Sequence, residues 1–162
     1  TVVKSGKEIA TMFIGRYSSR MGAKGRVAVP VKFRQGLGSR AIISQGYKKA
    51  LFLVAKPQWE QLTEPFVNQP LTVSPMVRDI ERFLFGSAYE IEFDDQGRIV
   101  IPQELRQFAG LDGEAVFLGL GKRVEIWSRS NWESYAATVA SNIEGISTEV
   151  AKIGNRVPKK DE

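Results

Sequence analysis

Cysteine and histidine are both absent from the 162 residues of the chain. Their absence removes thiol nucleophiles, imidazole general bases and most ligands of zinc, copper and haem. We therefore expect no metal and no other cofactor. The chain is predicted not to be an enzyme, and no small-molecule substrate is expected.

The remaining features that could suggest catalysis do not support it. Neighbouring acids such as Asp94 and Asp95 point to opposite faces of a strand. Glu90 and Glu92 share a face, but no apolar pocket is present to raise a carboxyl pKa. The pair Gly121-Lys122 lacks the upstream glycine of a phosphate-binding loop, because Val116 occupies that place. Hydrolysis of a nucleotide or another substrate is not predicted.

Long apolar runs are also missing, since no stretch approaches the ~18 residues that span a bilayer. The first residues show no charged start, apolar middle and cleavage site of an export signal. We expect a soluble, cytoplasmic protein with no membrane partner. A length of 162 residues fits one domain, or two very small ones that share a core.

Basic residues are concentrated in the first third of the chain. Residues 1–56 carry 12 Lys and Arg against the single acid Glu8, whereas residues 57–162 carry 11 against 17 acids. The first part therefore has a net charge of about +11 and the remainder about −6. Such a block indicates a polyanionic partner, although solvated basic faces also occur on proteins that bind nothing anionic.

The chain contains an internal repeat. Shifting residues 17–35 by 72 positions aligns Gly25-Arg26 with Gly97-Arg98 and Pro30 with Pro102. At a shift of 73 residues, Trp59-Glu60 falls on Trp132-Glu133, each after an apolar run. Only two copies fit, so the chain is a duplicated module rather than a solenoid. Modules this short need intertwining of copies or of subunits to bury enough apolar surface.

Each copy is predicted to form a strand, a tight turn, a second strand and a short helix. In the second copy, alternating strands flank the turn of Asp94 to Gly97, and Gly97 is expected to need a positive φ. Pro102 then starts a helix over 103–109 that Gly110 ends. The first copy repeats this pattern with Gly25, Pro30 and Gly36.

The other predicted elements lie outside the repeated motif. We expect a helix from Ser74-Pro75 to Gly86, with Met76, Ile80, Phe83 and Leu84 on one face, covering the core between the modules. A capping box at Ser130 to Glu133 predicts a helix from Asn131 to about Ser141. Residues 65–74 are predicted as a loop, and residues after Arg156 as poorly anchored. Trp59 and Trp132 are expected to be core anchors rather than base-stacking residues.

The tight turns place cations where a side chain can reach phosphate or a base edge. Lys24-Gly25-Arg26 and Gln96-Gly97-Arg98 form this pattern, and a solvated arginine after an ordinary turn is the alternative. Asp94 is expected to pair with Arg98, within the turn or across a symmetric interface. The cations of the first copy cluster within 19 residues, as a nucleic-acid footprint would. They are Arg16, Arg20, Lys24, Arg26, Lys32 and Arg34.

Residues 93–106, with the sequence FDDQGRIVIPQELR, resemble the signature of the SpoVT/AbrB swapped-hairpin DNA-binding domains. The start at Met12, the first motif from Lys24 to Arg34 and the stretch from Arg78 to Gly86 resemble the two-module MraZ family of that superfamily. One departure is Gly22, which occupies the first copy's position of Asp94.

The resemblance implies an α+β fold of two intertwined swapped-hairpin modules with short helices and a compact barrel-like core. It implies a nucleoid-associated transcriptional regulator of the division and cell-wall gene cluster, acting as a ring-like homo-oligomer larger than a dimer on repeated boxes in double-stranded DNA. Arg26, Arg34, Arg98 and Arg106 are the implied DNA-binding arginines. Gly25, Pro30, Asp94, Gly97 and Pro102 are expected to hold the turns and interface.

The expected domains are an extension at 1–11, a first module at 12–73, a linking helix with the second module at 74–141, and a tail at 142–162. Residues 1–11 precede the family-like start and are left out of the fold prediction. The alternative function is a structural or protein-interaction oligomer, whose basic hairpins serve assembly and solubility. Indifference to removal of the Arg26 charge would distinguish this alternative from a DNA-binding regulator.

Overall fold

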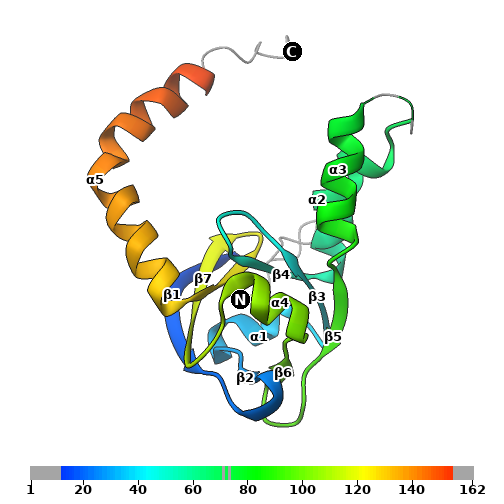
Figure 1. Ribbon diagram of the computed structural model, residues 1–162, viewed down its shortest axis with the longest axis vertical. Helices are drawn as coiled ribbons and strands as arrows, with labels where there is room; N and C mark the ends of the chain where they lie inside the picture. Colours follow the sequence, from blue (N-terminus) through cyan, green and yellow to red (C-terminus); the bar gives the residue numbers. More distant parts are fainter. Residues whose placement is uncertain (1–11, 71, 73, 155–162) are drawn as a thin grey trace, which may run out of the picture. The chain divides into compact units, whose positions relative to one another are not determined.

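A computed structural model describes residues 12–70, 72 and 74–154 (Figure 1). This part of the chain divides into two compact units, the first ending at Arg129 and the second beginning at Ser130. The first unit holds both copies of the repeat up to the last strand. The second unit is helical. The residues after Arg156, predicted to be poorly anchored, lie outside the described residues, as does the extension at 1–11.

The two copies fold into the same series of elements, which confirms the duplication. The first copy comprises β1 (Phe13–Arg20), a 3-10 turn (Ala23–Gly25), β2 (Arg26–Ala28), α1 (Val31–Leu37), β3 (Arg40–Gln45), β4 (Leu51–Ala55) and α2 (Lys56–Val67). After α3 (Pro75–Phe85), the second copy comprises β5 (Tyr89–Glu92), β6 (Arg98–Val100), α4 (Gln103–Ala109), β7 (Glu114–Gly121), β8 (Val124–Ser128) and α5 (Arg129–Gly154).

Each copy completes the sheet of the other. The six-stranded sheet has the order β1-β7-β8-β4-β3-β5, and every pairing in it is antiparallel. The first strand of each copy thus pairs with the hairpin of the other copy, β1 with β7 and β5 with β3. β2 and β6 form a separate two-stranded ribbon. The predicted intertwining of the copies is therefore present within one chain.

A single core between the copies explains why modules this short are stable. Its buried residues come from the ribbon (Val27, Ile99), from the short helices (Phe33, Leu105) and from the inner face of the sheet, all in one contiguous cluster. Burial of a large apolar side chain contributes about 1.5–3 kcal/mol. Neither copy could form this cluster alone, so the copies fold as one unit.

The fold is α+β as expected, but the sheet is open, whereas a barrel-like core was predicted. Among the described residues, β1 and β5 pair on one side only and form the two edges of the sheet. The chain leaves the sheet after Arg20 and after Glu92 to build the β2–β6 ribbon, so no strand pair joins the edges. No helix among the described residues is long and apolar enough to cross a membrane.

α3 begins and ends where predicted, with the Ser74 hydroxyl capping Met76 N–H and Gly86 closing the helix. Its predicted apolar face is wrong at Met76, which is 75% exposed. Leu84 packs with Trp59 of α2 and with Phe52 of β4 in a second, smaller cluster. α3 therefore covers one face of the first copy's hairpin rather than the core shared by the modules.

Two helix boundaries differ from the prediction and one agrees with it. Pro65, expected in a loop, lies inside α2, which continues to Val67. Gly36 lies inside α1, and the helix ends instead at Gly38, whose φ is +76°. In the second copy, α4 spans the predicted residues and Gly110 closes it with a left-handed conformation.

The last helix is much longer than predicted. α5 begins at Arg129, so Ser130 is not the residue before the helix, and it continues past Ser141 to Gly154. Trp59 is buried as expected of a core anchor, but Trp132 is only partly buried, and no residue of α5 is fully buried. The prediction of matched tryptophan anchors therefore holds for the first copy alone.

Candidate nucleic-acid interface

The β2–β6 ribbon presents two arginines on its outward face. In its register, Arg26 lies opposite Val100 and Ala28 opposite Arg98. The residues between them, Val27 and Ile99, are buried in the core. Because side chains alternate along a strand, Arg26 and Arg98 lie on the same, solvent-facing side. The ribbon thus carries one cation from each copy of the repeat.

The first turn leaves its cations accessible. Gly25 is buried with φ +77°, and Lys24 beside it takes a left-handed φ of 59°. The Gly22 N–H donates to the Arg26 carbonyl over 2.7 Å, which closes the turn through the backbone. Lys24 and Arg26 are exposed, and neither side chain forms a hydrogen bond or ion pair with another described residue.

The second turn closes through the backbone and also through a side chain. Asp94 N–H donates to the Arg98 carbonyl, and the Asp94 carboxylate accepts the backbone N–H groups of Arg98 and Gln96 at 2.9 Å. Arg98 Nε then donates to the same carboxylate over 2.7 Å. The N–H of Arg98, followed by its side chain, holds the pKa of Asp94 below its usual value. The expected pairing of Asp94 with Arg98 is confirmed within one turn.

Arg34 and Arg106 each pack against the turn glycine of the other copy. A Cβ at Gly97 would overlap the guanidinium of Arg34, and a Cβ at Gly25 would lie 2.6 Å from Arg106 Nε. Arg34 Nε donates to the Val29 carbonyl over 2.7 Å. Both arginines are half-buried. Their position supports the turns, and the DNA contact that the resemblance implies for them stays a prediction.

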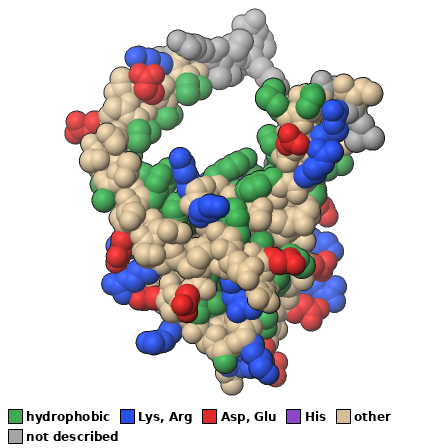
Figure 2. Space-filling view, in the orientation of Figure 1, with side chains coloured by type: hydrophobic (Ala, Val, Ile, Leu, Met, Phe, Trp, Pro, Cys, Tyr) green, Lys and Arg blue, Asp and Glu red, His purple; other side chains and the backbone are tan. Residues whose placement is uncertain are grey.

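The other predicted residues lie around this arrangement. Pro30 and Pro102 immediately precede α1 and α4, with φ of −51° and −53°. Lys32 is exposed in the first turn of α1, and Arg16 is exposed on β1. Arg20 lies opposite Glu114 in the β1–β7 register, so part of its charge is balanced. Figure 2 shows Lys and Arg side chains beside acidic ones on the first unit.

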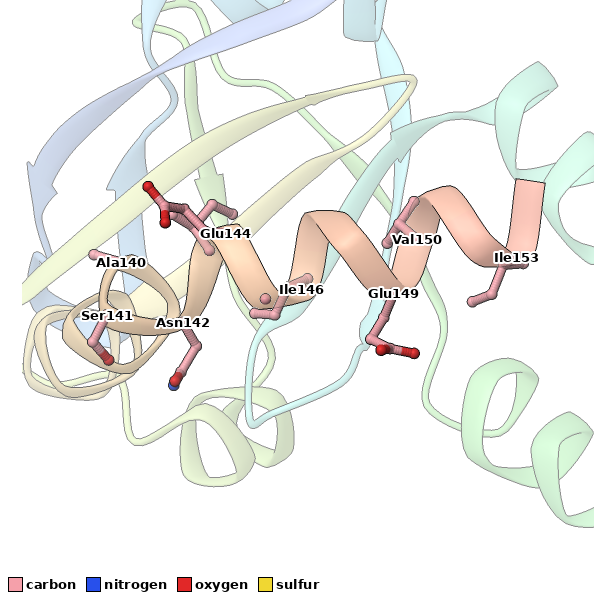
Figure 3. Close-up of a pocket in the computed structure, with 10 residues that line it drawn as sticks. Ala140, Ser141, Asn142, Glu144, Ile146, Glu149, Val150 and Ile153 are labelled. Carbon is pink, nitrogen blue, oxygen red and sulfur yellow. The ribbon is translucent and has the colours of Figure 1, made fainter. Parts of the chain in front are cut away.

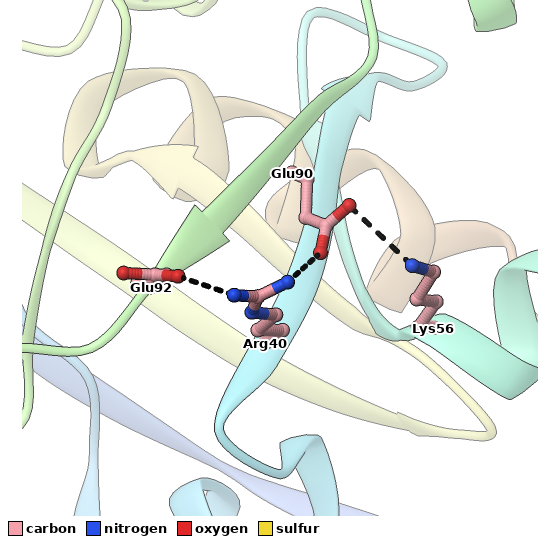
Figure 4. A network of polar contacts seen from close by, with 4 residues as sticks. All are labelled: Arg40, Lys56, Glu90 and Glu92. Atoms are coloured by element: carbon pink, nitrogen blue, oxygen red, sulfur yellow. Dashed lines mark hydrogen bonds and ion pairs between the residues drawn. The ribbon is translucent and has the colours of Figure 1, made fainter.

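The charge asymmetry of the sequence is partly neutralised between the copies. Arg40 of β3 contacts Glu90 and Glu92 of β5 at 3.5 Å and 3.1 Å, and Lys56 contacts Glu90 at 3.5 Å (Figure 4). These acids belong to the second copy, which was expected to be the more acidic. They are engaged by cations of the first copy, far in sequence from the ribbon.

The comparisons with known proteins agree with this arrangement. The sequence profile of the family described as "MraZ protein, putative antitoxin-like" matches residues 12–76 and 84–151. The chain belongs to the MraZ family. These two matches correspond to the two MraZ repeats, which interleave their strands in the fold described above.

Relatives within the MraZ family align over nearly their full length. The "Transcriptional regulator MraZ" of Acetivibrio thermocellus is 41% identical over 143 residues, covering 88% of this chain and 99% of that protein. Its namesake in Pelotomaculum thermopropionicum is 39% identical, covering 88% and 97%. Membership in the MraZ family identifies the chain as a transcriptional regulator, which is not an enzyme.

One feature of this MraZ chain was missed by the sequence prediction. Ile143, Ile146, Val150 and Ile153 lie on α5 within the segment predicted as a tail, and each is 45–63% exposed. They line a shallow hollow along the helix (Figure 3). Their alternating spacing of three and four residues was the signal that could have found the helix.

Proposed function

We propose that the chain is a sequence-specific regulator that binds double-stranded DNA through the β2–β6 ribbon. The ribbon carries this proposal, because it projects Arg26 and Arg98 from a rigid base of buried residues. Two-stranded ribbons are known to enter the major groove, and arginine can grip the O6 and N7 atoms of guanine. The exposed cations Lys24 and Lys32, close in sequence to Arg26, suit phosphate contacts that fix the register.

The proposed operator is a set of short repeated boxes in the promoter of a division and cell-wall gene cluster that includes the gene of this protein. The protein acts there as a ring-like homo-oligomer larger than a dimer, bound to the chromosome in the cytoplasm. Each ribbon offers few cations, so affinity for a single box is weak. Several ribbons at the spacing of the boxes bind together, and their effective concentration raises the affinity.

The proposed division of labour runs from residue 12 to the end of β8. The first module, 12–73, supplies most of the exposed cations, and the second, 74–141, completes the core and adds Arg98. Arg16 and Arg20 extend the basic surface along β1. Arg34 and Arg106 support the turns from beneath, and the buried packing of Gly25 and Gly97 keeps the ribbon in place.

The test is a fluorescence polarisation titration of the whole protein against DNA from upstream of its own gene. Scrambled DNA of equal length and composition is the control, and both are measured at two salt concentrations. We expect tighter binding to the promoter DNA, and weaker binding of both at higher salt, because released counterions contribute to affinity. Equal affinity for both DNAs would contradict sequence-specific recognition. Absence of binding to either would contradict the proposed function and favour the structural oligomer.

A further inference from the structure

α5 carries one continuous apolar stripe. Its members recur at alternating spacings of four and three residues, the heptad pattern in which apolar side chains return to one face every 3.5 residues. None of them is fully buried. They are Trp132, Ala136, Val139, Ile143, Ile146, Val150 and Ile153, and these seven residues are called the α5 seam.

The rest of the α5 surface is polar or small. Ser134, Ser141 and Thr148 lie opposite the seam, and Asn142 and Ser147 flank its middle. Helix residues 129–154 include three acids and two cations, so the polar face is not basic. An amphipathic helix that binds an anionic lipid surface is instead rich in Lys and Arg. The same balance makes the seam unsuited to DNA.

The shape of α5 indicates that its apolar side faces a partner. The helix bends along its length (Figure 1), and its hollow is lined by Ile146, Val150 and Ile153 (Figure 3). Gly145 and the Thr148 hydroxyl, which donates to the Glu144 carbonyl, lie in the middle of this segment. Glycine and such back-bonding hydroxyls bend helices. Helices curve with the concave side toward what they pack on.

We propose that the α5 seam packs against the α5 seam of a second copy of this chain. An identical helix fits because the heptad spacing is self-complementary, and the flanking Asn142 and Ser147 are uncharged, so identical helices bring no like charges together there. β-Branched residues occupy both kinds of seam position from Val139 to Ile153, a pattern that favours more than two strands. The inference rests on the proposed self-assembly and not on DNA binding.

Two variants of the full chain with the same added charge test the seam. Ile143→Asp/Ile146→Asp places two carboxylates in the seam, whereas Ser141→Asp/Thr148→Asp places them on the opposite face. Light scattering should give a multiple of the 18.1 kDa chain mass for the wild type and the control, and at most half of that multiple for the seam variant. The seam variant should still bind DNA of one box as the wild type does, and lose its advantage on repeated boxes.

Failure of the seam and failure of self-assembly give different results. A monomeric wild type would contradict both proposals. An oligomeric wild type with an unchanged mass for the seam variant would overturn the seam alone, and would mean that another surface assembles the protein.

Cross-linking gives a measurement that does not depend on destabilising the helix. The chain has no cysteine, so single cysteines report unambiguously. Ile143→Cys and Ile146→Cys proteins are oxidised alone and as a mixture, with Ser141→Cys and Thr148→Cys as controls. Parallel helices should link identical seam cysteines, and antiparallel helices should link only the mixture. Disulfide-linked pairs of chains in the seam variants and not in the controls are expected. Equal linking of seam and control cysteines, or none in either, would overturn the proposal.

Discussion

Arg34 and Gly97 lie 63 positions apart in the chain, in different copies of the repeat, yet the guanidinium of Arg34 occupies the space where a side chain at Gly97 would begin. Gly97 itself has φ +72°. Arg34 Nε is also bonded to the Val29 carbonyl, and Val29 N–H donates to the Gly97 carbonyl over 3.0 Å. Three residues from two copies therefore define the second turn together. The same relationship recurs between Arg106 and Gly25.

Gly97→Ala should destabilise the protein by about 1–3 kcal/mol, because alanine is strained at positive φ and its Cβ displaces Arg34. Gly38→Ala is the matched control, since Gly38 has φ +76° but no described atom within 4 Å of an added Cβ. The free energy of unfolding from urea titrations should fall further for Gly97→Ala. Equal decreases would show that the packing of Arg34 on Gly97 contributes nothing.

Arg34→Ala should lower stability even in the absence of DNA. The change leaves the Val29 carbonyl without its Arg34 donor, at a cost of about 1–3 kcal/mol. Lys32→Ala, two residues away and fully on the surface, should change stability by less than about 0.5 kcal/mol. Thermal and urea unfolding of both variants compare the two positions. A stable Arg34→Ala protein that no longer binds DNA would instead indicate direct DNA contact.

The Asp94 carboxylate should make a pH-dependent contribution to stability. Its pKa in the folded protein is below the unfolded value of about 3.9. The contribution is therefore present above that unfolded value and is lost as the pH falls through the lowered folded value. The difference in unfolding free energy between wild type and Asp94→Asn should be constant from about pH 5 to 7 and shrink below about pH 4. A difference that persists at low pH would contradict the assignment to the charged carboxylate.

The sequence predicted features that depend on neighbouring residues and missed those that depend on distant ones. Gly97 and Gly110 take the positive φ that their turn and helix end require, and Asp94 pairs with Arg98 four residues away. The packing of Arg34 on Gly97 follows from strand exchange between copies, which no local pattern shows. Gly36 was mistaken for the end of α1 because Leu37, one residue later, still reaches the core.

The same limit explains the last helix and the charge distribution. The capping box near Ser130 located the start of α5 to within two residues, but the stripe through Ile153 was not followed beyond Ser141. Net charge along the chain suggested that Glu90 weakens the second copy. In the structure Glu90 is engaged by Arg40 and Lys56, cations of the first copy, through the β3–β5 pairing.

The first copy should contribute more to DNA affinity than the second. Arg26 has no partner among the described residues, whereas Arg98 must leave Asp94 to bind DNA. Arg26→Ala should therefore weaken binding to promoter DNA more than Arg98→Ala in polarisation titrations. Asp94→Asn, which releases Arg98, should narrow the gap between the two copies. Equally weakened binding for both arginine variants would show that the pairing with Asp94 does not limit Arg98.

The most direct test of DNA recognition by the ribbon compares Arg26→Ala with Lys24→Ala on promoter DNA and scrambled DNA across a salt series. Arg26 is expected to read a base, so its removal should lower discrimination by ~1–3 kcal/mol for each base pair that it reads. Lys24 is expected to bind phosphate, so its removal should weaken both DNAs equally and reduce the salt slope by ~0.9 for each phosphate released, multiplied by the protomers engaged. Base reading by Arg26 predicts a smaller gap between the two DNAs for Arg26→Ala alone. An equal decrease in affinity for both DNAs in Arg26→Ala would contradict base reading by the ribbon.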